Sequence, residues 1–300
     1  MANKSWTALT FVMGIGVAAM SASNAGATLL LSYGFDDAPN SATAAPGGSL
    51  AGSAPALSIV GPAFIGPDGS GVSGAATDRA LDNRAASGMG GTTNSSGGRG
   101  THTADFDGID GLLKFTVSGW FKTDSTAPVG GNAILVANRS GIAGFDVHGD
   151  PNAPGNLILA RDNYSVTSPG FSATQQWVNF AVTFDGTILQ PGPNVFFYAG
   201  GLNTPLTLVG SGTATNGSGN DPVSDETMPL SIGSRVLFGS IDADPFDGLL
   251  DDIRIYNSVQ PLATLESQRL TDAGSVPEPS TLMLMALGFA GYFAKRTRNC

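Results

Sequence analysis

The chain has 300 residues, of which 42 are glycine and 18 are proline, and only 13% of them are charged. Glutamate is confined to Glu226, Glu266 and Glu278, and the other 21 acids are aspartate, which favours turns over helix interiors. This composition excludes a mainly helical protein, the net charge of −10 argues against a nucleic-acid-binding surface, and the single cysteine excludes a disulfide within the chain.

The first 27 residues predict a signal peptide. Lys4 gives a basic start, and an apolar run over residues 8–20 follows it. Ala25 and Ala27 fit the small-x-small rule for the signal peptidase, so we expect cleavage before Thr28, with cleavage after Ala25 as the alternative. The apolar run is too short for a permanent transmembrane anchor.

The middle of the chain alternates apolar and polar residues with period two, which predicts strands. In residues 114–122, Phe115 and Val117 share one face, and we expect a shift near Gly119 to bring Trp120 onto that face. In residues 177–185, the odd-numbered residues lie opposite an apolar set that includes Val178 and Phe184. Further strands are predicted at residues 29–35, 133–137, 156–161, 194–198, 229–233 and 248–256.

Helical spacing occurs in the middle segment only over residues 261–270. Residues 38–100 show no readable pattern, and residues 88–100 are typical of a loop. Because strands and helices do not alternate, the pattern argues against a parallel α/β sheet. The sequence therefore predicts one all-β domain over residues 28–273.

Residues 274–300 predict a sorting tail. They carry three features in order: a short motif, an apolar run and a basic end. These are Pro277-Glu278-Pro279, residues 281–294, and Lys295, Arg296 and Arg298. This resembles the PEP-CTERM sorting signal of Gram-negative bacteria. The resemblance implies processing by an exosortase at or near the motif, followed by release to the cell surface or the extracellular matrix. The 14 apolar residues would reach about 21 Å as a helix, short of the roughly 30 Å hydrocarbon core, so we expect a transient inner-membrane anchor; an ordinary tail anchor is the alternative.

Five pieces of the middle segment resemble, in the right order, the laminin G-like or concanavalin A-like jelly-roll family. They are SYGFDD (32–37), DFDGIDGLLKFTVSGWFKT (105–123), WVNFAVTFDG (177–186), LSIGS (230–234) and FDGLLDDIRIYNSVQPLATLES (246–267). The last piece fits the family's final strand and short helix at Gly248, Asp251, Asp252, Arg254, Tyr256, Asn257, Leu262 and Glu266. The resemblance implies two antiparallel sheets packed face to face, one of them concave. Together with the two terminal segments, the sequence predicts a jelly-roll sandwich with a signal helix at each end of the chain.

The same resemblance implies a calcium site, because related sandwiches often hold calcium with an aspartate of the final strand and carbonyls near the first. Asp251 is the matching residue, and Asp36 is a second candidate ligand. The alternative is that Asp251 and Asp252 cap a turn and pair with Arg254. Two aspartate-rich loops lack the EF-hand spacing and are interpreted as turns; they contain Asp105, Asp107 and Asp110, and Asp242, Asp244 and Asp247.

No catalytic residue is predicted. The Glu-x-Asp-x-x-Glu string of retaining glycosidases with this fold is missing, and His102 and His148 lie in no cluster with metal-ligand spacing. Trp120 and Trp177 are expected in the core, which leaves Tyr164 and Tyr198 as freer candidates for stacking on sugars.

The sequence thus predicts an exported, non-enzymatic surface or matrix protein that binds exopolysaccharide or a protein partner, with calcium as the candidate cofactor. Between the two terminal segments the chain holds ten bases and 23 acids; this surplus suits calcium or a neutral polysaccharide, and the alternative, which the charge alone favours, is that it only keeps the protein soluble. The alternatives are a structural matrix protein without a specific ligand and a glycan hydrolase that uses an aspartate pair.

Overall fold

A computed structural model describes residues 27–84, 97–140, 142–189, 191–225, 227–236 and 242–274. Within these residues every strand pair is antiparallel, and two eight-stranded sheets pack face to face. The predicted all-β sandwich is therefore confirmed. None of the helices in these ranges has the length and hydropathy needed to cross a membrane. The signal helices predicted at the two ends lie outside the described residues.

Sheet A has the strand order β14-β13-β12-β7-β18-β5-β4, and β1 pairs with β18 off this path. Its strands are β1 (Leu29–Tyr33), β4 (Phe64–Ile65), β5 (Leu81–Asp82), β7 (Lys114–Thr123), β12 (Val178–Asp185), β13 (Val195–Gly201), β14 (Thr207–Gly212) and β18 (Gly248–Tyr256). The predicted strands at residues 114–122, 177–185 and 248–256 form the centre of this sheet.

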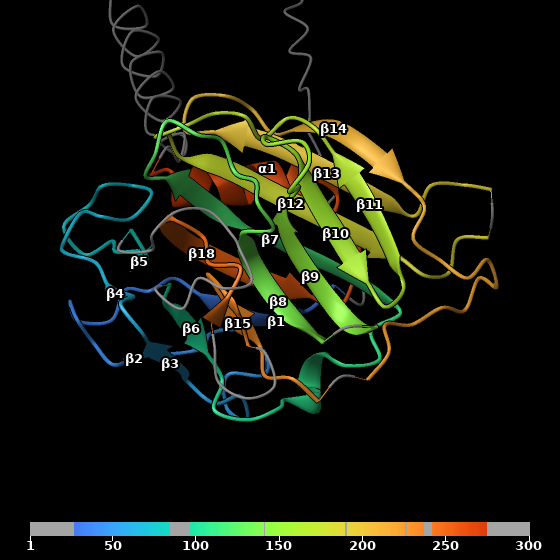
Figure 1. The fold of residues 1–300 in the computed structure, drawn as a ribbon, viewed down its shortest axis with the longest axis horizontal. Coiled ribbons are helices and arrows are strands. Elements are labelled where there is room, and N and C mark those ends of the chain that lie inside the picture. Colours follow the sequence, from blue (N-terminus) through green and yellow to red (C-terminus); the bar gives the residue numbers. More distant parts are fainter. Residues whose placement is uncertain are drawn as a thin grey trace, which may run out of the picture.

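Sheet B has the strand order β11-β10-β9-β8-β15-β6-β3-β2. Its strands are β2 (Thr43–Ala44), β3 (Leu57–Val60), β6 (Arg99–Thr101), β8 (Ile134–Ser140), β9 (Ala143–Gly149), β10 (Leu157–Arg161), β11 (Tyr164–Ser168) and β15 (Ser231–Ile232). Strands β16 (Arg235–Val236) and β17 (Asp242–Ala243) form a separate pair. In Figure 1, strands β8 to β11 overlie β7, β12 and β18.

The main core lies between the sheets and is filled by alternate residues of the long strands. In β12, Val182 and Phe184 are fully buried there, and in β7 the residues opposite them are Val117 and Phe115. Burial of such side chains stabilises the fold by about 25 cal/mol for each Å² of apolar surface removed from water. The alternation predicted for both strands is thus confirmed.

The shift predicted in β7 near Gly119 is wrong. Strand β7 keeps an unbroken register against β12, so Trp120 lies on the opposite face from Phe115. Trp120 packs instead in a second apolar cluster that includes Trp177 and Leu249. Both tryptophans are buried, as predicted, with 0% and 9% of their surface exposed.

The irregularity lies in the partner strand β18. Its register against β7 shifts between Asp251 and Arg254, so Asp252 and Ile253 both oppose Gly119. Two residues opposite one define a β-bulge, and here Asp252 has a φ of 51°, which is uncommon outside glycine. Strand β18 also changes neighbours at this point, from β5 before the bulge to β1 after it.

The predicted helix is present as α1 (Leu262–Asp272), which begins directly after Pro261. Its residue Leu265 packs with Ala181 and Leu206, on the face of sheet A that points away from sheet B. Helix α1 is therefore the one α-helix of the described residues, and it covers the outer face of sheet A.

Several strands were not predicted. Residues 38–100 contain β2 to β5 and part of β6, which are two to four residues long, and the prediction also omitted β9, β11 and β14. Strands this short provide too few alternating positions to show period two. In β11 and β14, polar or small residues occupy most positions, so these strands lack the apolar face that identifies β7 and β12.

Candidate functional site

Four aspartates, called here the acid cluster, gather beside the bulge of β18. Asp251 and Asp252 belong to β18, Asp36 follows β1, and Asp78 lies in the loop between β4 and β5. The bulge is the point at which the first and last strands of the domain meet, and this brings the two predicted metal ligands, Asp251 and Asp36, into one cluster.

Asp251 is the most deeply buried member, with 0% of its surface exposed. Its Oδ2 accepts a hydrogen bond of 2.9 Å from the Val72 amide, and its Oδ1 accepts one of 2.7 Å from the Asp252 amide. Burial, together with the charges of Asp252 and Asp78, raises the pKa of Asp251 well above the usual range. Its negative charge is therefore costly unless a cation accompanies it.

Asp78 was not identified from the sequence. Its Oδ2 accepts hydrogen bonds from the amide and the hydroxyl of Ser73, at 2.6 and 2.5 Å. Its Oδ1 and Oδ2 of Asp251 both lie close to Gly71. A Cβ added at Gly71 would collide with Oδ1 of Asp78 and would lie 2.8 Å from Oδ2 of Asp251. The only signal for Asp78 is a Gly- and Ser-rich loop that offers amide donors, and only long-range folding shows which strand the loop reaches.

Asp36 and Asp252 converge on a second glycine, Gly34. A Cβ there would lie 3.3 Å from Oδ2 of Asp36 and 3.8 Å from Oδ1 of Asp252. The Arg79 amide donates to the other oxygen of Asp36, at 3.1 Å. Burial raises the pKa of Asp252 to about 7 although the Arg254 charge lowers it, and burial also raises the pKa of Asp36.

Arg254 connects the acid cluster to helix α1. It donates to Oδ1 of Asp252 at 2.9 Å. It also donates two hydrogen bonds, of 2.7 and 2.8 Å, to the carboxylate of Asp272, the last residue of α1. The Trp120 indole also donates to Asp272, at 3.0 Å. The pairing of Arg254 that the sequence suggested as an alternative to a metal site is thus present, and it engages Asp252 rather than Asp251.

The acid cluster has the donor chemistry that calcium prefers, namely hard carboxylate oxygens. Within the described residues no hydrogen bond reaches Oδ2 of Asp36, Oδ1 of Asp78 or Oδ2 of Asp252. Burial, together with the charges of neighbouring aspartates, raises the pKa of Asp36, Asp251 and Asp252 although Arg79 and Arg254 lie nearby. The donor chemistry therefore suits a divalent cation, but among the described residues no three carboxylates of the acid cluster have oxygens within 4.8 Å of one another.

A second group of acids is more closely spaced. Carboxylate oxygens of Asp105, Asp107 and Asp110 lie within 4.8 Å of one another. Oδ1 of Asp105 accepts a hydrogen bond of 2.7 Å from the Phe106 amide, and Asp107 begins a short 3-10 turn. These roles agree with the interpretation of this loop as an aspartate-rich turn.

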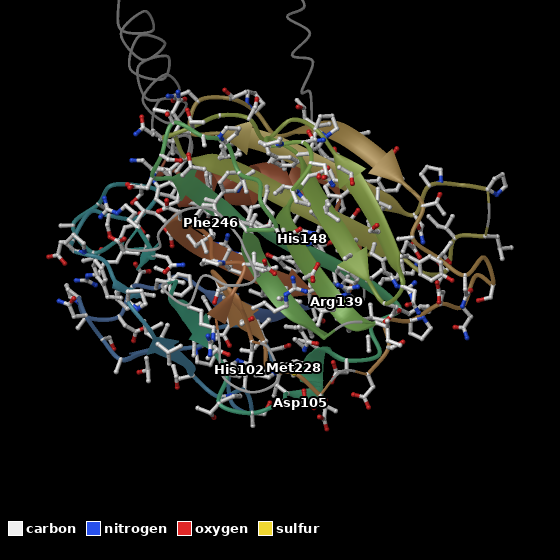
Figure 2. All side chains as sticks on the ribbon, in the orientation of Figure 1. His102, Asp105, Arg139, His148, Met228 and Phe246 are labelled. Atoms are coloured by element: carbon white, nitrogen blue, oxygen red, sulfur yellow. The ribbon has the colours of Figure 1, made fainter. Side chains whose placement is uncertain are left out.

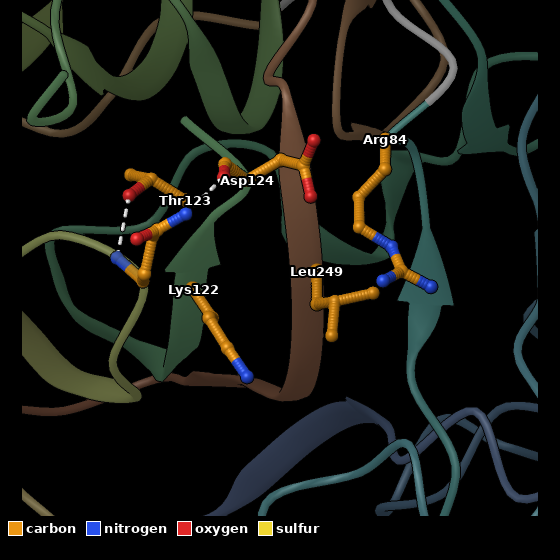
Figure 3. Close-up of a pocket in the computed structure, with 6 residues that line it drawn as sticks. Arg84, Lys122, Thr123, Asp124 and Leu249 are labelled. Atoms are coloured by element: carbon orange, nitrogen blue, oxygen red, sulfur yellow. Dashed lines mark hydrogen bonds between the residues drawn. The ribbon is translucent and has the colours of Figure 1, made fainter. Parts of the chain in front are cut away.

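Next to the acid cluster, three adjoining hollows form what we call the rim groove. The first has a volume of about 230 Å³ and lies between Arg84, Lys122, Asp124 and Gln175, with Leu249 in its wall (Figure 3). Arg84 is paired with the buried Asp82, and the Lys122 ammonium makes no ion pair within the described residues.

The second and third hollows continue the rim groove, with volumes of about 310 and 280 Å³. The second shares Lys122 and Gln175 with the first, and the third shares Gln176, Trp177 and other residues with the second. The remaining lining comes from the turn after β13 and from small residues, namely Gly201, Leu202, Asn203 and Thr204, and Gly170, Ala173, Ala199 and Gly200.

Both walls of the rim groove are fixed by hydrogen bonds. Gln175 receives its position from the end of β7, because its amide donates to Oγ1 of Thr123 at 3.1 Å and its side chain donates to the Asp124 carbonyl at 2.9 Å (Figure 3). The opposite wall is a tight turn, closed by hydrogen bonds of 3.0 and 3.4 Å between Gly201 and Thr204.

Helix α1 fixes this turn through hydrogen bonds. The Arg269 guanidinium donates to the carbonyls of Gly201 and Leu202 at 2.5 and 3.0 Å, and it is itself bound by Glu266. The other side of the hairpin is fixed too, since Glu266 accepts from the Leu206 amide at 2.8 Å. The groove walls are therefore preorganised rather than loose loops.

One carboxylate pair lies near the first hollow. The Asp247 residue is 8% exposed, its Oδ1 has no hydrogen-bond partner among the described residues, and its carbonyl accepts from the Asp124 amide at 3.1 Å. Burial and the nearby Asp124 charge raise the pKa of Asp247 to about 6. This pair could not be identified from the sequence, because the two residues belong to different strand ends.

The two histidines lie apart (Figure 2). His102 is buried beside Tyr33, whose hydroxyl lies 2.7 Å from Nε2, and burial lowers the pKa of His102 to about 4. His148, on β9, lies 2.8 Å from the buried carboxylate of Asp146. Neither histidine belongs to a metal group among the described residues.

The two tyrosines suggested as stacking candidates are partly buried. Tyr164 packs against the main core and lies under the Arg161 guanidinium, at 5.4 Å from the ring centre. Tyr198 packs in the small cluster beneath α1. Neither ring lines a hollow of the rim groove.

The predicted processing residues of the chain ends cannot be placed. Ala25, Pro277, Glu278 and Pro279 lie outside the described residues, and Ala27 is exposed at the start of the first described range. Helix α1 ends at Asp272, two residues before that part of the chain ends.

Comparison with solved structures shows similarity in fold. The binding domain of botulinum neurotoxin DC, solved with rat synaptotagmin II, has a TM-score of 0.52 and 10% identity, over 81% of this chain and 51% of that one. A receptor binding domain has a TM-score of 0.53 and 10% identity, over 81% and 51%. Domain 4 of AbnA, a GH43 extracellular arabinanase from Geobacillus stearothermophilus solved with arabinotriose, has a TM-score of 0.49 and 19% identity, over 81% and 98%. The chain thus spans about half of the two binding-domain chains.

Comparison of sequences places the chain in a family. No curated protein matches it. The PEP-CTERM protein-sorting motif matches residues 275–299, which implies an exported protein sorted to the cell surface. The profile of the concanavalin A-like lectin/glucanases superfamily, Laminin_G_3, matches residues 95–263. Since this match covers more than half of the chain, the protein belongs to the concanavalin A-like lectin/glucanases superfamily.

Proposed function

We propose that this protein is a non-enzymatic carbohydrate-binding module of the cell surface or extracellular matrix, and that it holds its glycan in the rim groove. The observation that carries the proposal is the lining of that groove. Amide, hydroxyl and ammonium groups of Gln175, Gln176, Asn203, Thr204 and Lys122 converge on it, and its walls are fixed by hydrogen bonds. A few placed polar groups in a preformed cleft are typical of a small-molecule or glycan site.

The acid cluster serves this function indirectly. A calcium ion bound among Asp251, Asp36, Asp78 and Asp252 would neutralise their charges and draw these carboxylates together where the first and last strands meet. The cluster adjoins the groove through shared packing, because Trp120, which binds the last residue of α1, packs with Trp177 of the groove floor. We therefore assign calcium a structural role.

The terminal segments determine where the protein is localised. An exosortase would process the tail at Pro277-Glu278-Pro279 after a transient stay in the inner membrane of a Gram-negative bacterium. The exposed domain would then bind the exopolysaccharide that surrounds the producing cell. The support for this route is the sorting motif at residues 275–299.

The test is a binding measurement with the mature protein and the producer's own exopolysaccharide, with calcium and again with EDTA. Saturable binding that a Gln176→Ala, Asn203→Ala double variant loses supports the proposal. Loss of that binding in EDTA, accompanied by a lower melting temperature, supports the structural ion. The absence of binding in both buffers would contradict the proposal and favour a structural matrix protein without a specific ligand.

A second candidate function is glycan hydrolysis, and the Asp124–Asp247 pair favours it. Glycosidases use a carboxyl group with a raised pKa for general acid catalysis, together with a second carboxyl group nearby. The test is release of reducing sugar from the same exopolysaccharide. Turnover that disappears in Asp247→Asn but survives in Asp105→Asn would replace the non-enzymatic function by this one.

A further inference from the structure

We infer that the rim groove selects a neutral, unbranched glycan and binds at least three consecutive sugar units, one in each hollow. This inference rests on the proposed function and adds the ligand's charge, shape and length to it. Three independent features support it, namely the course of the groove, its charge and the size of its hollows.

The groove runs across the strands of sheet A rather than along them. Its lining passes from Leu249 in β18 through Lys122 in β7 and Trp177 beside β12 to the ends of β13 and β14. These five strands are neighbours in the sheet, so four spacings of about 4.8 Å give the groove a length of about 19 Å. Such a length accommodates several sugar rings in a row.

This course also argues against an extended peptide. A peptide that adds to a sheet runs parallel to an unpaired edge strand and uses its free amides and carbonyls. The groove instead crosses β18, β7, β12 and β13, each of which is paired on both sides, and it reaches the edge strand β14 only at one end. The groups available to a ligand are therefore side-chain amides and hydroxyls, which suit sugar hydroxyls.

The charges that line the groove cancel. Arg84 is neutralised by Asp82 with a two-oxygen contact, and the other two charged lining residues, Lys122 and Asp124, carry opposite charges without forming an ion pair. The domain as a whole carries a surplus of 13 acids over bases between the two terminal segments, so its field repels an anionic polymer. No basic patch in the groove offsets that repulsion, and a neutral glycan is favoured.

Each hollow has room for only part of a longer ligand. Their volumes of about 230, 310 and 280 Å³ lie at or below the lower end of about 300 Å³ found for pockets that hold a whole drug-sized ligand. Each hollow shares residues with the next, Lys122 and Gln175 at one junction and Gln176 and Trp177 at the other. Successive units of one chain can therefore occupy successive hollows.

The experiment uses the mature protein released by the producing cells and fragments of their exopolysaccharide. The fragments are sorted by length from two to six residues and by charge on an anion exchanger, and binding is measured by calorimetry. We expect the affinity for neutral fragments to rise about 10-fold or more from two to four residues and then to level off, and to stay constant between low and high salt. Acidic fragments of equal length should bind at least about 10-fold more weakly.

Variants locate the site. Gln176→Ala combined with Asn203→Ala should weaken binding of the four-residue neutral fragment about 10-fold or more, while Asn220→Ala, which changes an exposed amide away from the groove, should leave it unchanged. Tighter binding of acidic fragments, or affinity that is independent of length, overturns this inference while carbohydrate binding stands. Binding by both variants at the affinity of the unaltered protein overturns the assignment to the groove. Failure of every fragment and of the intact polysaccharide to bind removes the proposed function itself.

Discussion

Ile253 occupies the space that a side chain at Gly119 would need. A Cβ on Gly119 would lie 2.5 Å from Cδ1 of Ile253 and 3.2 Å from its Cα. The reason is the bulge of β18, which places two residues opposite this one position of β7. Glycine in β7 is thus what allows the bulge to form, and the bulge in turn places Asp251 and Asp252 in the acid cluster.

Gly119→Ala should therefore destabilise the protein. The added methyl group meets backbone as well as side chain, so we expect a loss of about 1–3 kcal/mol in the free energy of unfolding. The matched control is Ser118→Ala on the same strand, whose buried hydroxyl has no partner and whose loss should change stability by less than about 0.5 kcal/mol. Denaturant unfolding measures both, and equal stability of the two variants would contradict the packing argument.

The strands that the sequence predicts well carry large apolar residues on one face over a long run. Residues 177–185 alternate cleanly because Val182, Phe184 and their neighbours fill the core, and the same holds for residues 114–122. The sequence pattern predicted an irregularity in β7, because Trp120 does not continue the alternation of Phe115 and Val117, whereas the bulge lies in β18. Its true position depends on which residue of β18 pairs with Gly119, and pairing across more than 100 residues leaves no local pattern.

The candidate site, too, could be predicted only in part. Asp251 could be named because the final strand resembles a family motif, whereas Asp78 lies in a loop without a readable pattern. The rim groove was missed entirely. Its residues come from five strand ends that are adjacent only after the sheet forms, and amides such as Gln176 are unremarkable in a sequence.

The Arg254–Asp272 pair should contribute more to stability than a surface ion pair. Asp272→Ala removes an acceptor that is 4% exposed and leaves Arg254 and the Trp120 indole without it, so we expect a loss of about 3 kcal/mol. The matched control is Asp68→Ala, which breaks the pair of Arg79 with a carboxylate that is 61% exposed and should cost less than about 1 kcal/mol. Thermal and denaturant unfolding of both variants check the difference. Equal losses would show that burial does not set the strength of these pairs.

Asp247 should make stability depend on pH. Its pKa is about 6 in the folded protein and about 3.9 in an unfolded chain, so the folded state holds the proton more tightly. The contribution is fully present below about pH 4 and is lost as the pH rises through about 6. Asp247→Asn should remove this loss and be more stable than the unaltered protein by about 1–2 kcal/mol at pH 7.5, with little difference at pH 4.

The measurement is denaturant unfolding between pH 4 and pH 8 in EDTA, which removes any contribution from a bound cation. Asp124→Asn serves as the comparison, because it removes only the neighbouring charge and should weaken the pH dependence without abolishing it. A pH profile of Asp247→Asn that parallels that of the unaltered protein would show that Asp247 titrates normally.

Helix α1 should affect ligand binding through the turn that it supports. Arg269→Lys keeps the charge but loses the planar fork that reaches the carbonyls of Gly201 and Leu202, so the turn that carries Asn203 gains freedom. Ordering a loosened wall costs binding free energy, and we expect the dissociation constant for a neutral glycan fragment to rise about 3- to 10-fold. The control on the same helix is Gln268→Ala, which breaks a hydrogen bond of 2.7 Å to Tyr256 without touching the turn. Calorimetric titration of both variants, each shown to be folded at the assay temperature, separates positioning of the groove from general loosening of α1, because only the second would affect the two variants alike.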